Sequence, residues 1–259
     1  MADAVAPARF DHARRSTQPE WLDNADLGEA ELAPYLRSLA AINRATLGHW
    51  PIIGWLRRAT SDASREPLIL LDVGCGNGDL LRVLSRWSRR HRPGLRFIGI
   101  DRDPHTIDVA RAATGDAEPI EYIVADVFDY RPARRIDFVT GSLVTHHLPD
   151  HLIVGLLHFM ESTAQRGWIN CDLQRHVIPH GFIGAVGALT RLHPLVVHDG
   201  RISVARSLTR AEWERLIART TIPRGALRLR WFLFRLVLSR LHGVAAGEGV
   251  NARFTNYNT

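Results

Sequence analysis

Short, continuous apolar runs recur along the middle of the chain and alternate with amphipathic stretches. The first run, LILLDV, is of the length and character typical of a parallel strand that is buried on both faces. Predicted strands lie at 68–73, 95–100, 120–124, 136–140 and 167–171. Apolar residues recur at helical spacing in 79–90, 104–114 and 151–162. Strands that alternate with helices at this spacing predict a doubly wound, Rossmann-like α/β sheet.

The pattern changes before this core. Residues 1–18 mix Ala, Arg and Pro without periodicity, and we expect them to be disordered. Residues 19–60 contain two helical patterns, at 29–46 and 51–59, and we expect them to form an N-terminal helical cap.

The α/β domain is expected over residues 66–240, followed by a C-terminal tail at 241–259. Near its end, residues 208–220 show a helical pattern and residues 227–238 are predicted to be a last strand. The mixed aromatic and basic residues of that strand could contact a membrane surface or RNA, but a strand in the sheet requires neither.

A strongly apolar insertion at 176–197 follows the fifth strand. Gly181, Gly184 and Gly187 make it compact or mobile and allow close helix packing. It could be a lid over an apolar ligand, a helix buried against the sheet, or the contact of a homodimer. The dipeptide Asp199-Gly200 beyond it is a turn signal.

Composition narrows the possible chemistry. The 259 residues include 33 basic ones, all of them arginine. Without lysine, pyridoxal-phosphate enzymes, Schiff-base aldolases and Walker-type NTPases are excluded, because each needs that side chain. The net charge of +6 is spread along the whole chain, so we do not expect nucleic acid binding.

Targeting signals and metal-ligand spacings are not found in the sequence. The start of the chain lacks an apolar signal region, and no apolar run is long enough to cross a membrane. The two cysteines, Cys75 and Cys171, are not in metal-type spacing and are predicted to be free thiols. We therefore expect a cytoplasmic, metal-independent protein without stable membrane insertion.

A glycine-rich loop follows the first strand in LDVGCGNGD, which spans residues 71–79. Gly74, Gly76 and Gly78 let the backbone approach a ligand closely at the start of a helix. A dinucleotide fingerprint would have glycine where this chain has Asp79, and a carboxylate there would repel a pyrophosphate. Asp72 suits a ligand with a positive amino group better than one with phosphates.

Two further acids stand at the ends of the next two strands. Asp101 could accept hydrogen bonds from both hydroxyls of a ribose, and Asp126 could accept one from an adenine amino group. Each acid alone could be a helix N-cap. Three strand-end acids in this order, together with the glycine loop, make a much more specific signal.

These stretches resemble the class I S-adenosylmethionine (SAM)-dependent methyltransferase family over about residues 66–175. The matching motifs are LDVGCGNG (71–78), FIGID (97–101), IVADVFD (123–129) and DFVTGSLVTHHLPD (137–150). The resemblance implies a seven-stranded sheet ending in an antiparallel hairpin, with SAM as cofactor. It also implies cofactor contacts from Asp72, Gly74, Cys75, Gly76, Gly78, Asp101, Arg102, Asp126, Val127, Ser142 and Leu143.

Two adjacent histidines follow the fourth strand, at the edge where open α/β sheets bind ligands. A neutral imidazole could take the proton of a phenol acceptor, so His146 and His147 are the candidate catalytic residues. We favour His146, because we expect His147 to point into the fold. Alternatively, the pair only shapes the loop.

Around the apolar insertion, Tyr35, Arg175, His176 and His198 are candidate acceptor-binding residues. The stretches 170–175 and 198–207 resemble bacterial methyltransferases of polyketide or phenolic-lipid pathways. This implies O-methylation of a small hydrophobic or aromatic acceptor, with C-methylation of a quinone or polyketide ring as the alternative. An RNA or protein methyltransferase, a non-catalytic SAM-binding protein and a dehydrogenase also remain open.

Overall fold

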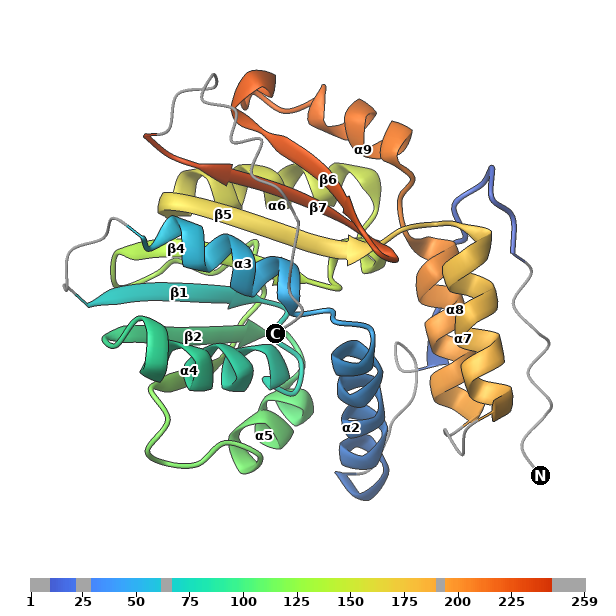
Figure 1. Cartoon of the computed structure of the whole chain (residues 1–259), viewed down its shortest axis with the longest axis horizontal. Coiled ribbons are helices and arrows are strands. Elements are labelled where there is room, and N and C mark those ends of the chain that lie inside the picture. The colour runs from blue at the N-terminus through green and yellow to red at the C-terminus, as the bar shows by residue number, and fades with distance from the viewer. Residues whose placement is uncertain (1–9, 22–28, 62–66, 190–193, 244–259) are drawn as a thin grey trace, which may run out of the picture.

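The computed structural model describes residues 10–21, 29–61, 67–189 and 194–243, and in this part of the chain seven strands form one sheet (Figure 1). The strand order is β3-β2-β1-β4-β5-β7-β6. The strands are β1 (Leu68–Val73), β2 (Leu95–Asp101), β3 (Ile120–Val124), β4 (Ile136–Ser142), β5 (Ala164–Leu173), β6 (Arg228–Phe232) and β7 (Arg235–Leu241). Strands β1 to β5 are parallel, and β7 runs antiparallel to both β5 and β6. The predicted fold class is confirmed.

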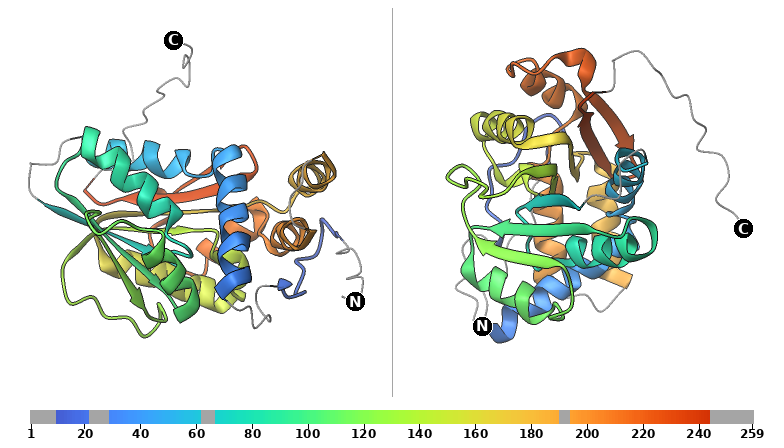
Figure 2. Two further views of the ribbon diagram at one scale, coloured as in Figure 1. Left: turned by 90° about the horizontal axis from the view of Figure 1, so that it is seen from below. Right: turned by 90° about the vertical axis from the view of Figure 1, so that its left-hand side faces the viewer.

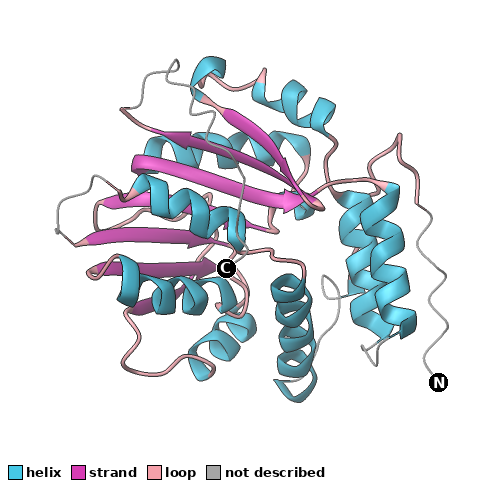
Figure 3. Cartoon of the chain, in the orientation of Figure 1, coloured by secondary structure: helices cyan, strands magenta, loops and turns pink. Residues whose placement is uncertain are grey.

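Helices cover both faces of the sheet (Figure 3). One face packs against α3 (Trp50–Ala59), α4 (Asp79–His91) and α5 (Pro104–Ala112), and the other against α6 (Asp150–Thr163) and α9 (Arg210–Ile217). Each strand of the centre therefore buries both of its faces, which is why these strands read as continuous apolar runs. Of the two helices that we expected to form the N-terminal cap, the second, α3, packs in this layer against the sheet.

Three further helices stand beyond the carboxyl ends of the parallel strands (Figures 1 and 2). They are α2 (Glu29–Ala45), α7 (Val177–Leu189) and α8 (Pro194–Arg206). Tyr35 of α2 and Val196 of α8 are buried in the cluster that joins these two helices. The insertion thus forms a helical hairpin, α7–α8, that covers the carboxyl edge of the sheet together with α2.

Residues 10–18, which we expected to be disordered, instead pack against this edge; residues 1–9 lie outside the described part. The backbone N–H of Ser16 donates to the carbonyl of Ala205 in α8. The guanidinium of Arg15 donates to the carbonyl oxygens of Arg206, Thr145, His146 and Leu148. These contacts hold the N-terminal segment across the loop that follows β4.

Two element predictions are wrong. The predicted strand at 227–238 is two strands, β6 and β7, joined by a tight turn in which Leu233 has a φ of 48°. No glycine or proline marks that turn, so the run of apolar residues looks continuous. The turn predicted at Asp199-Gly200 lies inside α8. The short helices η1 (Thr145–His147) and η2 (Arg224–Ala226) complete the described elements.

Both cysteines are buried free thiols, as expected. Among the described helices, none combines the length and hydropathy that a membrane crossing requires.

Candidate functional site

The glycine loop between β1 and α4 has three left-handed glycines with different surroundings. The φ angles of Gly74, Gly76 and Gly78 are 63°, 53° and 71°. A Cβ at Gly74 would lie 2.4 Å from a methyl carbon of Val144, and one at Gly78 would lie 2.1 Å from the hydroxyl of Tyr122. A Cβ at Gly76 would meet nothing within 4 Å. Gly74 and Gly78 are therefore needed for packing, whereas Gly76 presents its backbone to open space, as a ligand cradle does.

A buried acid, Asp72, and a half-buried one, Asp101, flank this loop. Asp101 Oδ2 accepts the N–H of Gly76 at 3.0 Å, and Oδ1 accepts the N–H of Asp103 at 3.1 Å. Asp72 is 2% exposed, and its Oδ1 has no hydrogen-bond partner among the described residues. Burial raises the pKa of both carboxyl groups, and the charge of Asp101 raises the pKa of Asp72 further. A ligand with positive groups fits this pair, because it would stabilise both carboxylates.

The remaining predicted cofactor residues lie at the same edge in different environments. Asp126 is exposed, and its Oδ1 accepts the N–H of Phe128 at 2.9 Å. Arg102 is exposed, Val127 and Ser142 are half-buried, and Cys75 is buried. Leu143 has a φ of 61°, a strained angle for a residue with a side chain, and its N–H donates to the carbonyl of Cys171.

A cavity of about 160 Å³ opens beside Leu143, beneath α2, α7 and α8. Its wall includes both apolar and polar residues. The apolar lining residues are Leu39, Ile42, Leu143, Leu173, Pro179, Phe182, Ile183, Val196 and Phe234. The polar ones are Glu20, Asn43, Thr46, His146, His147, Ser203 and Arg235. The α7–α8 hairpin therefore forms part of the wall of a cavity, which favours the lid interpretation of the insertion.

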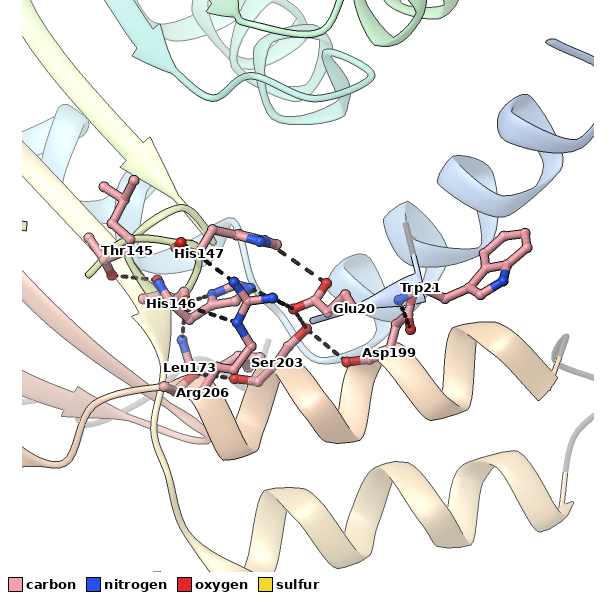
Figure 4. A network of polar contacts seen from close by, with 12 residues as sticks. Glu20, Trp21, Thr145, His146, His147, Leu173, Asp199, Ser203 and Arg206 are labelled. Atoms are coloured by element: carbon pink, nitrogen blue, oxygen red, sulfur yellow. Dashed lines mark hydrogen bonds and ion pairs between the residues drawn. The ribbon is translucent and has the colours of Figure 1, made fainter. Parts of the chain in front are cut away.

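His146 lines the cavity and lies between two carboxylates. Its Nδ1 is 2.7 Å from Asp172 Oδ1, and its Nε2 is 3.5 Å from Glu20 Oε1. Its backbone N–H donates to Asp172 Oδ2, which also accepts the hydroxyl of Thr145. The hydroxyl of Ser203 in α8 donates to Glu20 Oε1 at 2.8 Å, and Figure 4 shows this network.

These contacts decide the charge of His146. Burial of the ring disfavours the charged form, but the charge and hydrogen bond of Asp172, aided by Glu20, outweigh it and raise the pKa of His146 to about 9. The same interactions lower the pKa of Asp172 to about 2 against the effect of its burial. Burial raises the pKa of Glu20, but the bond and charge of His146, with contributions from His147 and Ser203, together outweigh burial and lower the pKa of Glu20. At neutral pH His146 is thus an imidazolium with no free site for another proton.

His147 is the more accessible of the two histidines. Its side chain is 32% exposed, against 3% for His146, so the expectation that His147 points into the fold is wrong. Its Nε2 is 4.0 Å from Glu20 Oε2, and the two imidazole rings are 4.2 Å apart between centroids. Glu20, His146 and His147 each offer an atom that could coordinate a metal ion, and these atoms lie within 4.8 Å of one another. We assign no metal to them, because the imidazolium and Arg206, 3.9 Å from Glu20, already supply positive charge.

The four predicted acceptor-binding residues do not line the cavity. Tyr35 is buried and donates its hydroxyl to Asp199 Oδ2 at 2.5 Å. Arg175 is 1% exposed and is held by Glu212, the carbonyl of Ser207 and the carbonyl of His12. His176 Nδ1 accepts the N–H of Ile178 at the start of α7, and His198 Nδ1 is 3.0 Å from Asp199 Oδ1. Their contacts are structural, within and between the elements that surround the site.

Glu20, Asp172 and Arg235 are site residues that were not predicted. Asp172 lies near the end of β5, so the strand-end rule that selected Asp72 and Asp101 could have found it. Nothing near Glu20 in the sequence marks it, because its partners come from η1 and α8.

Together, the strand order, the glycine loop and the strand-end acids define the class I SAM-dependent methyltransferase fold. Residues 70–167 match the family described as a methyltransferase domain, which agrees with this fold. Buried Asp72 with its unpartnered oxygen, and the open space at Gly76, fit the amino-acid end of a SAM cofactor.

Known proteins agree with this assignment. The chain is 30% identical over 115 residues to a trans-aconitate 2-methyltransferase of an Enterobacter species, covering 42% of each chain. It is 33% identical over 100 residues to the Escherichia coli protein of the same name, covering 37% of this chain and 36% of that one. The match thus spans about two fifths of these curated relatives.

Among solved structures, the chain resembles the plantazolicin methyltransferase BpumL in complex with S-adenosylhomocysteine (SAH). The TM-score is 0.59 at 15% identity, covering 82% of this chain and 94% of that one. The related enzyme BamL gives a TM-score of 0.53 at 16% identity, covering 78% and 77%. These similarities support the fold.

Proposed function

We propose that this protein transfers the methyl group of SAM to the oxygen of a small, hydrophobic or aromatic acceptor, such as a phenol. The observation that carries the proposal is the largely apolar cavity beside Leu143, with Glu20 and the two histidines in its wall. Val144, next to Leu143, packs against Gly74 of the glycine loop, so the cavity adjoins the expected cofactor site. The relatives' names indicate different acceptors, and the acceptor class therefore rests on the cavity.

The cofactor supplies an electrophilic methyl group, and the chain's own residues bind and prepare the acceptor. Gly76, Asp72 and Asp101 would hold the cofactor. His147 is the base that takes the proton of the acceptor hydroxyl at Nε2, and the nearby carboxylate of Glu20 stabilises the imidazolium so formed. His146, already charged, stabilises the negative charge that develops on the acceptor oxygen. The apolar walls exclude water.

His147→Ala is expected to lower the methylation rate by roughly 100- to 10,000-fold, because the acceptor loses its base. The assay uses methyl-labelled SAM with a panel of alkylphenols and identifies the product by mass and NMR. His151→Ala, an exposed histidine of α6, is the matched control and should keep the wild-type rate. A methyl group on a ring carbon would instead establish C-methylation. SAH binding without turnover of any acceptor would favour a non-catalytic protein.

The loop glycines provide a second test. Gly78→Ala is expected to lower the free energy of unfolding by roughly 2–4 kcal/mol, since strain at positive φ adds to the overlap with Tyr122. Gly76→Ala should cost only about 1 kcal/mol of backbone strain, yet weaken SAH binding. Urea unfolding and calorimetric titration measure the two effects. Equal SAH affinity for Gly76→Ala and the wild type would argue against a cofactor at this loop.

A further inference from the structure

Arg235 lines the same cavity as Glu20 and the two histidines, and it stands at the first position of β7. It is only 2% exposed. Its Nη1 donates to the carbonyl of Thr46 at 3.3 Å, and its Nη2 donates to Asn43 Oδ1 and Thr46 Oγ1, both at 3.0 Å. All three acceptors are neutral, and no described carboxylate forms an ion pair with this guanidinium. A guanidinium has five N–H donors, so two remain.

A second buried arginine, in contrast to Arg235, has a carboxylate partner. Arg175 is 1% exposed, and Glu212 neutralises it at 2.5 Å. Burying a charge without a counter-ion is costly, and burial accordingly lowers the pKa of Arg235. Asp172 attracts Arg235 from farther away, but both Asp172 oxygens are engaged by His146 and Thr145. The carbonyl end of α2 offers Arg235 only a partial negative charge. A bound anion would neutralise the guanidinium more fully.

The chain also makes room for this side chain. A Cβ at Gly48 would lie 2.8 Å from Arg235 Nη2 and 2.9 Å from the carbonyl of Asn43. Any larger residue at position 48 would displace the guanidinium from the end of α2. Arg235, Asn43 and Thr46 all line the cavity, so the charge is held beside the space that a ligand would fill.

We propose that Arg235 is a carboxylate-binding residue, and that the ligand of this cavity carries a carboxylate that completes the ion pair. The inference rests on the proposed methyltransferase function. Two ligands of such an enzyme could supply the group: a carboxylated acceptor, or the amino-acid end of the cofactor. The acceptor is the expected source, because Arg235 lines the cavity rather than the glycine loop. The acceptor would then be an aromatic or aliphatic acid whose apolar body lies along Leu39, Ile42 and Phe234.

Two matched ligand pairs test the proposal by calorimetry. The first pair is cinnamate and cinnamyl alcohol, titrated in the presence of saturating SAH, and the second is SAH and its decarboxylated analogue. The wild type is expected to bind cinnamate about 10- to 100-fold more tightly than the alcohol. In Arg235→Gln this preference should disappear while affinity for the alcohol stays unchanged, which a merely structural role would not produce. Arg235→Lys should retain part of the preference, and Arg228→Gln, at an exposed position of β6, should retain all of it.

The outcomes separate the claims. A wild type that prefers neither carboxylate, or an unchanged preference in Arg235→Gln and Arg235→Lys, overturns the carboxylate assignment. If Arg235→Gln loses only the preference for SAH over its decarboxylated analogue, the carboxylate that Arg235 binds belongs to the cofactor and not to the acceptor. Failure of the wild type to bind SAH at all overturns the proposed function itself. If Arg235→Gln does not fold, the wild type and Arg235→Lys still decide the question.

Discussion

Asp101→Ala is expected to weaken SAH binding by roughly 100- to 1,000-fold, because charge-assisted hydrogen bonds to the ribose are lost. The carboxylate also accepts the N–H of Gly76 and that of Asp103, so its removal takes away one tie between the glycine loop and the end of β2 and leaves the bond from the Cys75 N–H to the Ile100 carbonyl. Calorimetric titration of the purified protein with SAH measures the loss, and Asp101→Asn, which keeps one acceptor oxygen, should be intermediate.

The control is Asp108→Ala on α5, where the side chain is 58% exposed and pairs with Arg111 of the same helix. It should bind SAH as the wild type does. NADH is titrated in parallel and is expected not to bind, because Asp79 stands where a dinucleotide site has glycine. Binding of NADH, or full SAH affinity in Asp101→Ala, would refute the assignment of this loop to SAM.

Hydrophobic pattern located the sheet well where burial is uniform. Strand β1 has the predicted bounds and β2 is one residue longer, because helices cover both faces of these two strands. Strand β3 also has the predicted bounds, although it lies at the edge of the sheet with Glu121 and Val124 exposed. β5 extends from Ala164 to Leu173, beyond the predicted 167–171, since its ends are less uniformly apolar. The pattern failed at β6 and β7, where Leu233 makes the turn with a positive φ that nothing in its residue type indicates.

The prediction of a turn at Asp199-Gly200 failed because these residues lie inside α8. Asp199-Gly200 is a turn signal in isolation, but tertiary contacts hold it in a helix. Asp199 accepts the N–H of Trp21 and the hydroxyl of Tyr35, so its carboxylate serves the N-terminal segment rather than a turn. A Cβ at Gly200 would lie 3.2 Å from Ile183 of α7, so glycine permits the two helices to pack closely. Trp21, Tyr35 and Ile183 all lie outside the local sequence around position 200, so the turn signal carries no information about these contacts.

The cofactor side of the site was more predictable than the acceptor side. The loop glycines and Asp101 act through one strand–loop–helix unit and its neighbouring strand, and such local units leave sequence motifs. The acceptor side is assembled from the N-terminal segment, η1, β5 and α8, which meet only in the folded chain. Sequence could therefore name His146 but could not show that Asp172 and Glu20 hold it charged.

The charged state of His146 leads to a second large effect, on stability. Its pKa is about 9 in the folded protein against an ordinary 6.5, so folding favours its protonated form. This contribution to stability is complete below pH 6.5, declines as the pH rises, and is lost above about 9. Wild-type protein should therefore lose on the order of 2–3 kcal/mol of unfolding free energy over that interval.

His146→Gln should be destabilised by roughly 3–5 kcal/mol at the acidic end of that interval, because Asp172 and Glu20 lose their shared counter-ion. The deficit should shrink towards pH 9, where the wild type no longer gains from the proton. Urea unfolding of both proteins across the interval measures this, with His151→Gln as an exposed control that should follow the wild type. The chain suits the experiment, since it has no lysine to titrate on the alkaline side and burial raises the pKa of Cys171 to about 12. A deficit that stays constant with pH would mean that His146 is neutral in the folded protein, and the base would then have to be chosen again between the two histidines.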